Sequence, residues 1–189
     1  MAQLLGETTD ANNYSRQMNK VKEGYNRCWN GYAYRHPEYN DCTDDRVQAL
    51  AVVSGIAEQD KYPYIIDLFK KQFYASPYME KYVMEALFVM GEGKYAMERM
   101  QKRFAPMVNH PFYTTLFEGW DIGPNGFGGG TVNHAWSGGP LIVIARYVCG
   151  IEPLDAAYKT FRIAPDDTYL HQAAITIPTI AGEIRSSFE

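Results

Sequence analysis

The chain has 189 residues and a formal net charge of −4 at pH 7, with 22 acidic against 18 basic side chains. That length suffices for one ordinary domain with a sizeable core and a small second piece. The weakly acidic balance and the lack of a Lys/Arg cluster argue against a nucleic-acid partner, because phosphate binding needs a concentrated basic face. No apolar stretch approaches the length needed to cross a bilayer, so we expect no membrane partner.

The cysteines and histidines give no metal signature. Cys28, Cys42 and Cys149 lie far apart without C-x-x-C spacing, and their odd number does not favour a disulfide scaffold. The histidines at positions 36, 110 and 171 are isolated from one another, so no metal triad is expected. The first residues, MAQLLGETTDANN, lack the basic head and apolar run of a secretory signal peptide. The sequence leaves the compartment open.

A first helix is predicted over about residues 10 to 29. Apolar residues recur there at helical spacing, and Thr8, Thr9 or Asp10 can cap the first amides. We expect one face to be buried, formed by Tyr14, Met18, Val21, Tyr25, Cys28 and Trp29. The following segment, residues 30 to 41, is rich in Gly, Tyr, His, Pro and Asn, which is typical of an ordered connection near a cleft.

A second helix opens at Thr43-Asp44-Asp45 and runs to about Ala57. Its acids lie at the positive end of the helix dipole, which is a structural reason for their presence. The alternative, that one of them reaches an active cleft, stays open. Its inward side is predicted to be formed by Val47, Leu50, Ala51 and Ser54.

Three more helices are predicted before residue 106. Pro63 suits the first turn of one, whose apolar side is Ile65, Ile66, Phe69 and Phe73. The next follows Ser76-Pro77 and ends before Gly91, with Met79, Tyr82, Val83, Ala86, Leu87 and Met90 inward. Glu85 lies among them, and we expect it to be hydrogen-bonded in the helical wall, although a desolvated glutamate is also a candidate acid. The last runs from Gly93 to about Phe104 and presents Ala96, Met97, Met100 and Phe104.

From Pro106 the helical pattern lapses. The glycine-rich stretch from Asp121 to Thr131 has no Gly-Lys-Ser/Thr ending, so it predicts a loop at the mouth of a cleft rather than a P-loop. A final helix is expected from His134 or Ala135 to Cys149, ending at Gly150. Period-two patterns then predict strands from Tyr158 to Ile163 and over residues 173 to 183. The chain is therefore predicted to be mainly α over residues 1–155, with a short β segment over 156–189.

Glu118 is the first candidate for chemistry. It stands in the run TTLFEGWD, between Phe117 and Trp120, and the segment Asn133-His134-Ala135-Trp136 follows downstream. Aromatic faces for stacking beside one acid or base form the kind of surface that a sugar ring requires. Each ring also has a structural interpretation: Trp120 and Trp136 can fill the core, and His134 can cap a helix.

Several motifs resemble one enzyme family in their order. TTLFEGWD, NHAWSGG, VCGIEPLD and YKTFRIAPDD, preceded by DDRVQALAVVSGIA and YVMEALFVMGE, look like the carboxyl-terminal part of the catalytic domain of bacterial alpha-L-rhamnosidases, glycoside hydrolase family 78. The resemblance implies antiparallel helical hairpins forming part of an (α/α)6 barrel, or toroid, followed by the start of a β-sandwich. Short gaps between the predicted helices favour such hairpins.

The resemblance also implies a mechanism and a site. The family inverts configuration, with Glu118 as the matching general base and Phe117 standing where tryptophan is usual. A rhamnoside would contact Phe117, Trp120, Asp121, Asn133, His134 and Trp136. Acetal hydrolysis by paired carboxylates needs no cofactor, so none is expected.

The second carboxyl is not evident. The family's general acid comes from the first half of the barrel, which has no counterpart in this sequence, and only Asp41, Asp44, Asp45 and Glu85 are substitutes. We therefore expect the isolated chain to be weakly active or inactive.

A non-catalytic function is the alternative. The chain would then be a degenerate hydrolase that binds sugar through Trp120, Trp136 and Tyr39. It could equally be half of a toroid completed by a partner or a second copy, because an incomplete barrel exposes the apolar flanks of its terminal helices.

Overall fold

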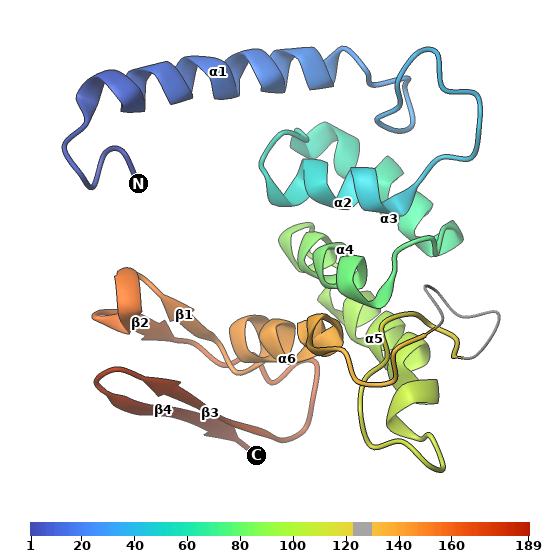
Figure 1. Cartoon of the computed structure of the whole chain (residues 1–189), viewed down its shortest axis with the longest axis vertical. Coiled ribbons are helices and arrows are strands. Elements are labelled where there is room, and N and C mark those ends of the chain that lie inside the picture. The colour runs from blue at the N-terminus through green and yellow to red at the C-terminus, as the bar shows by residue number, and fades with distance from the viewer. Residues whose placement is uncertain (123–129) are drawn as a thin grey trace. The chain divides into compact units, whose positions relative to one another are not determined.

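The computed structural model describes residues 1–122 and 130–189. The chain divides into two compact units, Met1–Phe73 and Tyr74–Glu189. Helices dominate both units, and two antiparallel strand pairs lie in the carboxyl-terminal part of the second (Figure 1). The prediction of a mainly α chain with a short β segment at its end is confirmed. Within the described residues, no helix combines the length and apolar character needed to span a membrane.

Helix α1 (Thr8–Asn26) forms as predicted but buries none of its residues. Its apolar stripe is largely exposed, with 62% of Tyr14, 64% of Met18 and 59% of Val21 accessible. The expectation of a buried face is therefore wrong for this part of the helix. Helical spacing indicates that a stripe exists, but only another element can cover it.

The end of α1 is the part that packs. The Tyr25 ring lies 5.3 Å from that of Tyr34, and the Asn26 side-chain amide donates to the carbonyl of Ile56 at 3.2 Å. The backbone N–H of Trp29 bonds three residues back, to Asn26, at 3.2 Å, so the helix has already ended in a turn.

Residues 30–44 form the ordered connection that the sequence predicts. The buried Gln48 side chain accepts the Tyr34 N–H at 2.8 Å and donates to the Tyr34 carbonyl at 2.9 Å. The Asn30 side chain accepts the N–H groups of Tyr32 at 3.0 Å and Ala33 at 2.9 Å. These bonds satisfy backbone groups that a loop would otherwise leave unpaired.

Helix α2 (Asp45–Val53) is shorter than predicted, and a different set of its residues is buried. It ends before Gly55, whose φ of 71° closes the helix with an Ile56 N–H bond to Ala51 at 2.9 Å. Leu50 is 45% exposed and Ser54 is also exposed, so both inward assignments are wrong. The Gln48 side chain bonds to the loop. The inward face consists of Asp45, Gln48, Ala49, Ala51 and Val52.

A one-turn segment, η1 (Gln59–Lys61), leads into α3 (Tyr62–Lys71), which has Pro63 in its first turn as predicted. Ile65, Leu68 and Phe69 are completely buried. Phe73 lies beyond the helix and is 42% exposed, because α3 ends two residues before it.

In the second unit, α4 (Pro77–Val89) and α5 (Gly93–Val108) pack against each other across the short connection 90–92. Ser76 caps α4, and Gly91 follows it with a φ of 82°. Helix α5 continues past Pro106, where the sequence suggested an end. The shared core is rich in methionine and aromatic side chains, and consists of Met84, Met97, Met100, Phe104, Met107, Phe117, Val143 and Val148.

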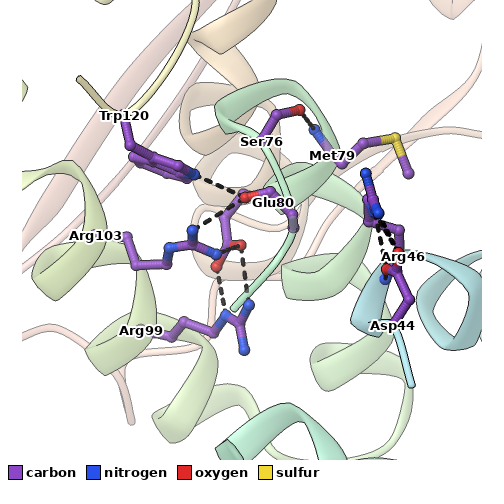
Figure 2. A network of polar contacts seen from close by, with 9 residues as sticks. Asp44, Arg46, Ser76, Met79, Glu80, Arg99, Arg103 and Trp120 are labelled. Atoms are coloured by element: carbon purple, nitrogen blue, oxygen red, sulfur yellow. Dashed lines mark hydrogen bonds and ion pairs between the residues drawn. The ribbon is translucent and has the colours of Figure 1, made fainter. Parts of the chain in front are cut away.

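A buried charge network fastens α4 to α5. The fully buried Glu80 accepts Arg99 Nε at 2.5 Å and Arg103 Nη1 at 2.6 Å. Figure 2 shows both arginines reaching Glu80 from α5. Arg103 also donates to the Ala75 carbonyl at 3.0 Å. A buried carboxylate is tolerated only when it is paired and hydrogen-bonded in this way.

The final helical region is continuous but irregular. It begins as a 3-10 turn, η3 (Ala135–Gly138), continues as α6 (Gly139–Val143) and ends as a π-helical segment, η4 (Ile144–Val148). The predicted single helix is thus replaced by three kinds of turn. Gly150 follows with a φ of 68°, as the glycine past its end.

Two hairpins complete the chain. Strand β1 (Ile151–Pro153) pairs with β2 (Phe161–Ile163), and β3 (Ala173–Thr179) pairs with β4 (Gly182–Phe188). β1 was not predicted, and Tyr158 belongs to a 3-10 turn, η5 (Ala156–Tyr158), rather than to a strand. The Ser186 hydroxyl donates to the Cys149 carbonyl at 2.8 Å, which ties the second hairpin to the helical region.

Candidate functional site

Two segments flanking the glycine-rich stretch are held together at Glu118. The Glu118 N–H donates to the Thr131 carbonyl at 3.0 Å, and the His134 N–H donates to the Leu116 carbonyl at 2.9 Å. The buried Ser137 hydroxyl donates to the Phe117 carbonyl at 2.6 Å. The TTLFEGWD and NHAWSGG motifs are therefore adjacent in space.

The Glu118 carboxylate is the acceptor of a short donor chain. The Thr131 hydroxyl donates to Glu118 Oε2 at 2.7 Å, and Nδ1 of His134 lies 3.0 Å from the same hydroxyl. A hydroxyl has one proton, so the ring nitrogen must donate to it, which assigns the proton of a neutral His134 to Nδ1. Nδ1 is also 3.7 Å from Glu118 Oε2. The Glu118 side chain is 16% exposed.

An exposed series of rings begins beside this carboxylate. The Trp136 ring lies 4.1 Å from the His134 ring and 5.4 Å from that of Tyr78 on α4. Tyr78 continues to Tyr82, whose ring centroid is 5.8 Å away. Trp136 and Tyr78 are each 38% exposed, so these rings offer apolar faces to solvent. Such faces suit contact with the C–H face of a ring-shaped ligand.

Trp120, by contrast, is occupied by protein groups. Its indole N–H donates to the Ala75 carbonyl at 2.7 Å, and the Arg103 guanidinium lies 4.1 Å from the ring centroid. The edge contact with Phe104 has a centroid distance of 5.1 Å. These contacts connect Trp120 to the buried charge network (Figure 2).

Phe117 is also in the interior. It is 3% exposed and packs edge-on against His110, with ring centroids 5.4 Å apart. Asp121 and Asn133 are exposed, and their side chains make no hydrogen bond to another described residue. The predicted loop at the mouth of a cleft falls largely on residues 123–129, which lie outside the described residues.

The candidate acids are distributed over both units. Glu85 is 5% exposed and accepts Lys81 Nζ at 3.1 Å, which confirms its predicted place as a hydrogen-bonded residue in the helical wall. Asp44, Asp45 and Asp41 belong to the first unit. Although burial alone raises the pKa of Asp44, hydrogen bonds from Arg46 lower that pKa below its ordinary value. Among the described residues, no three His, Cys, Asp or Glu side chains are grouped to hold a metal ion.

The sequence did not predict Thr131 or Tyr78 as residues of the site. Thr131 is close to His134 in sequence, but its role depends on backbone pairing with the segment of Glu118. Tyr78 reaches Trp136 only because α4 packs against the region of η3 and α6. No local pattern announces a contact between residues so far apart in sequence.

Two cavities in the described part of the chain lie away from this site. One, of about 570 Å³, is in the first unit between the end of α1 and the start of α2. Another, of about 580 Å³, is nearly all apolar and lies between α5 and α6.

Comparison with known proteins gives a structural likeness. No family model matches the sequence, and no curated protein matches it. The crystal structure of a GH78 family rhamnosidase of Bacillus sp. GL1 superimposes with a TM-score of 0.80 over 98% of this chain, at 22% identity. The chain spans 21% of the length of that protein. At this identity the likeness concerns the fold, so the chain has the fold of one part of a GH78 rhamnosidase, as the sequence resemblance implied.

Proposed function

We propose that this chain supplies the general base and part of the sugar-binding surface of a glycoside hydrolase that removes terminal alpha-L-rhamnosyl residues. The observation that carries the proposal is the hydrogen-bonded chain from His134 through Thr131 to Glu118, with exposed rings beside it. The fold likeness to a GH78 rhamnosidase supports the choice of substrate class.

In an inverting hydrolysis, one carboxylate removes a proton from water while a protonated carboxyl donates to the leaving oxygen, the two standing roughly 6.5–9.5 Å apart. Glu118 is the carboxylate that removes the proton from water. The hydrogen bond from the Thr131 hydroxyl fixes the orientation of its carboxylate. The proposal assigns no acid in this unit, because Glu85 is engaged by Lys81 and nearly buried. We therefore expect the isolated chain to bind sugar and to hydrolyse aryl rhamnosides weakly or not at all.

Sugar contacts follow from the groups left available. Because His134 Nδ1 donates to Thr131, Nε2 is left as an acceptor for a sugar hydroxyl. The exposed side chains of Asp121 and Asn133 supply further polar contacts, and Trp136 with Tyr78 supplies the stacking face. Phe117 and Trp120 contribute by packing behind the site.

The experiment measures rhamnose binding through tryptophan fluorescence, and hydrolysis of 4-nitrophenyl alpha-L-rhamnoside. Trp136→Ala should weaken rhamnose binding roughly twofold to tenfold, since aromatic contacts contribute about 0.5–1.5 kcal/mol. Glu118→Gln should abolish any turnover while leaving binding within about twofold, because the amide keeps the shape but cannot accept a proton. Glu98→Gln, an exposed glutamate on α5, is the matched control. Turnover that survives Glu118→Gln, or a folded chain that does not bind rhamnose, would refute the proposal.

A second candidate function is that of a helical toroid completed by another copy of the chain. Two apolar surfaces favour it: the α1 stripe of Tyr14, Met18 and Val21, and the apolar cavity between α5 and α6. Exposed patches of this kind usually mark contact sites. Sedimentation velocity should then give a dimer that Met18→Glu dissociates. A monomer at all concentrations would refute this second function, and sugar binding would then be the remaining proposal.

A further inference from the structure

The first unit contains a cavity that the proposed hydrolase function does not use. It has a volume of about 570 Å³ and lies between the end of α1, the connection 30–44 and the start of α2. Pockets for small molecules typically measure ~300–1,000 Å³. Nine side chains line it: Tyr25, Cys28, Tyr34, Arg35, His36, Tyr39, Thr43, Asp44 and Val47.

The walls of this cavity are fixed by hydrogen bonds. The Gln48 side chain hydrogen-bonds to both the N–H and the carbonyl of Tyr34. The Tyr34 hydroxyl donates to Asn26 at 2.9 Å. Arg35 Nε donates to the Tyr39 carbonyl at 2.8 Å, and its Nη2 donates to the carbonyl of Asp41. A pocket that is already ordered loses little conformational entropy when a molecule enters it.

The two charged side chains at the cavity already have partners in the protein. The Arg35 guanidinium donates to loop carbonyls and lies 5.4 Å from the centre of the Tyr39 ring. Asp44 accepts the Arg46 N–H at 2.7 Å and pairs with the Arg46 side chain. Because the protein itself engages both groups, the surface left for a bound molecule is mainly aromatic.

Few polar groups remain for a bound molecule. The hydroxyls of Tyr25, Tyr39 and Thr43 make no hydrogen bond within the described part of the chain. His36 Nδ1 accepts the Glu38 N–H at 3.2 Å, so a neutral His36 carries its proton on Nε2 as a donor. The rest of the lining consists of tyrosine rings, an aliphatic side chain and a thiol. These surfaces suit a flat ring with one or two hydrogen-bonding groups.

We propose that this cavity binds the neutral aromatic ring of a phenol, either as the free compound or as the aglycone of an aryl glycoside. A sugar presents a hydroxyl on nearly every ring carbon and would need more polar partners than these four side chains supply. A phenol places one hydroxyl or ether oxygen among them and its ring between the tyrosines. This inference does not depend on the role of Glu118.

The test uses the whole chain, with phenol as the probe and amide chemical shifts as the readout. Phenol should shift amides within residues 25–47. Tyr39→Ala should weaken its binding roughly threefold to tenfold by removing a ring contact. Val47→Phe should weaken it further by filling the cavity, and Thr43→Val should weaken it while keeping the shape. Tyr14→Ala, at an exposed tyrosine of the same unit outside the cavity, and Glu118→Gln should leave it unchanged.

Two glycosides distinguish whether the bound ring is a free phenol or the aglycone of an aryl glycoside. Phenyl alpha-L-rhamnoside that displaces phenol from residues 25–47 identifies the aglycone, whereas failure to displace it identifies the free phenol. Methyl alpha-L-rhamnoside, which has no aromatic ring, should leave these amides unshifted. Phenol that shifts none of them, equal affinity in Tyr39→Ala, Val47→Phe and the unaltered chain, or methyl rhamnoside bound at the same amides would overturn the proposal.

Discussion

The Thr131 hydroxyl donates a hydrogen bond to Oε2 of Glu118 at 2.7 Å. Because the hydroxyl proton is used on Glu118, its contact with His134 requires a proton on Nδ1 of that ring. The contact therefore fixes both the orientation of the carboxylate and the tautomer of the histidine.

Removing that hydroxyl tests the donor chain. In Thr131→Val we expect rhamnose binding to fall roughly tenfold, because a hydrogen bond to a charged group contributes about 1.5–3 kcal/mol and the sugar-facing His134 ring loses its support. Thr131→Ser keeps the hydroxyl and should bind nearly as well as the unaltered chain. Long-range proton–nitrogen spectra should place the proton of neutral His134 on Nδ1 in the unaltered chain. Finding it on Nε2 would contradict the proposed direction of donation.

The buried Glu80 should dominate the stability of the second unit. Glu80→Gln removes the buried carboxylate that Arg99 and Arg103 share, so we expect a loss of about 3–5 kcal/mol in the free energy of unfolding. Urea titration followed by the fluorescence of Trp120 and Trp136 measures it. The exposed control Glu98→Gln should change stability by less than about 0.5 kcal/mol. Equal midpoints for the two variants would show that the buried ion pair contributes little.

The Asp44 ion pair should make the first unit sensitive to acid. Hydrogen bonds from Arg46 lower the pKa of Asp44 below 3.8 despite the opposing effect of burial. A lowered pKa stabilises the fold above the unfolded value, and that stability is lost as the pH falls through the folded pKa. At neutral pH, Asp44→Asn, which keeps a capping oxygen, should be less stable by roughly 0.5 kcal/mol. The difference should shrink below the pKa of the unfolded carboxyl, and urea titrations followed by Trp29 fluorescence at several pH values measure it.

Loss of the cap itself provides the comparison for Asp44. Asp44→Ala removes the oxygen that accepts the Arg46 N–H, so at acid pH it should remain about 1 kcal/mol less stable than Asp44→Asn. A difference between Asp44→Asn and the unaltered chain that grows as the pH falls would contradict the assignment.

Gly150 should be the glycine least tolerant of a side chain. Its φ is 68°, and a Cβ there would meet the carbonyl oxygen of Ala164 at 1.9 Å, a backbone atom that cannot rotate away. We expect Gly150→Ala to cost more than about 3 kcal/mol, since steric overlap adds to the left-handed conformation. Gly91 has a φ of 82° but open space around it, so Gly91→Ala should cost only about 1–2 kcal/mol. Thermal unfolding of the two variants separates conformational strain from close packing, and equal losses would refute the distinction.

The sequence predicted elements that rest on local chemistry. The start of α4 after the break at Ser76-Pro77, the glycine after α4, and the apolar positions Ala96, Met97, Met100 and Phe104 of α5 all agree with the structure. Each depends on neighbours within one or two turns, so spacing alone carries the information. The same spacing failed at Met18 and Leu50, because burial depends on which element lies opposite.

The candidate site shows the same division. The sequence alone determined that Glu118 stands among aromatic residues and that His134 and Trp136 follow nearby. Only the tertiary structure decided that Thr131 joins Glu118 to His134, that Trp136 stays exposed beside Tyr78, and that Trp120 turns its N–H toward Ala75. The reason is physical: residue type and period fix what a side chain can bond or bury, whereas the partner that satisfies it is selected when distant segments pack together.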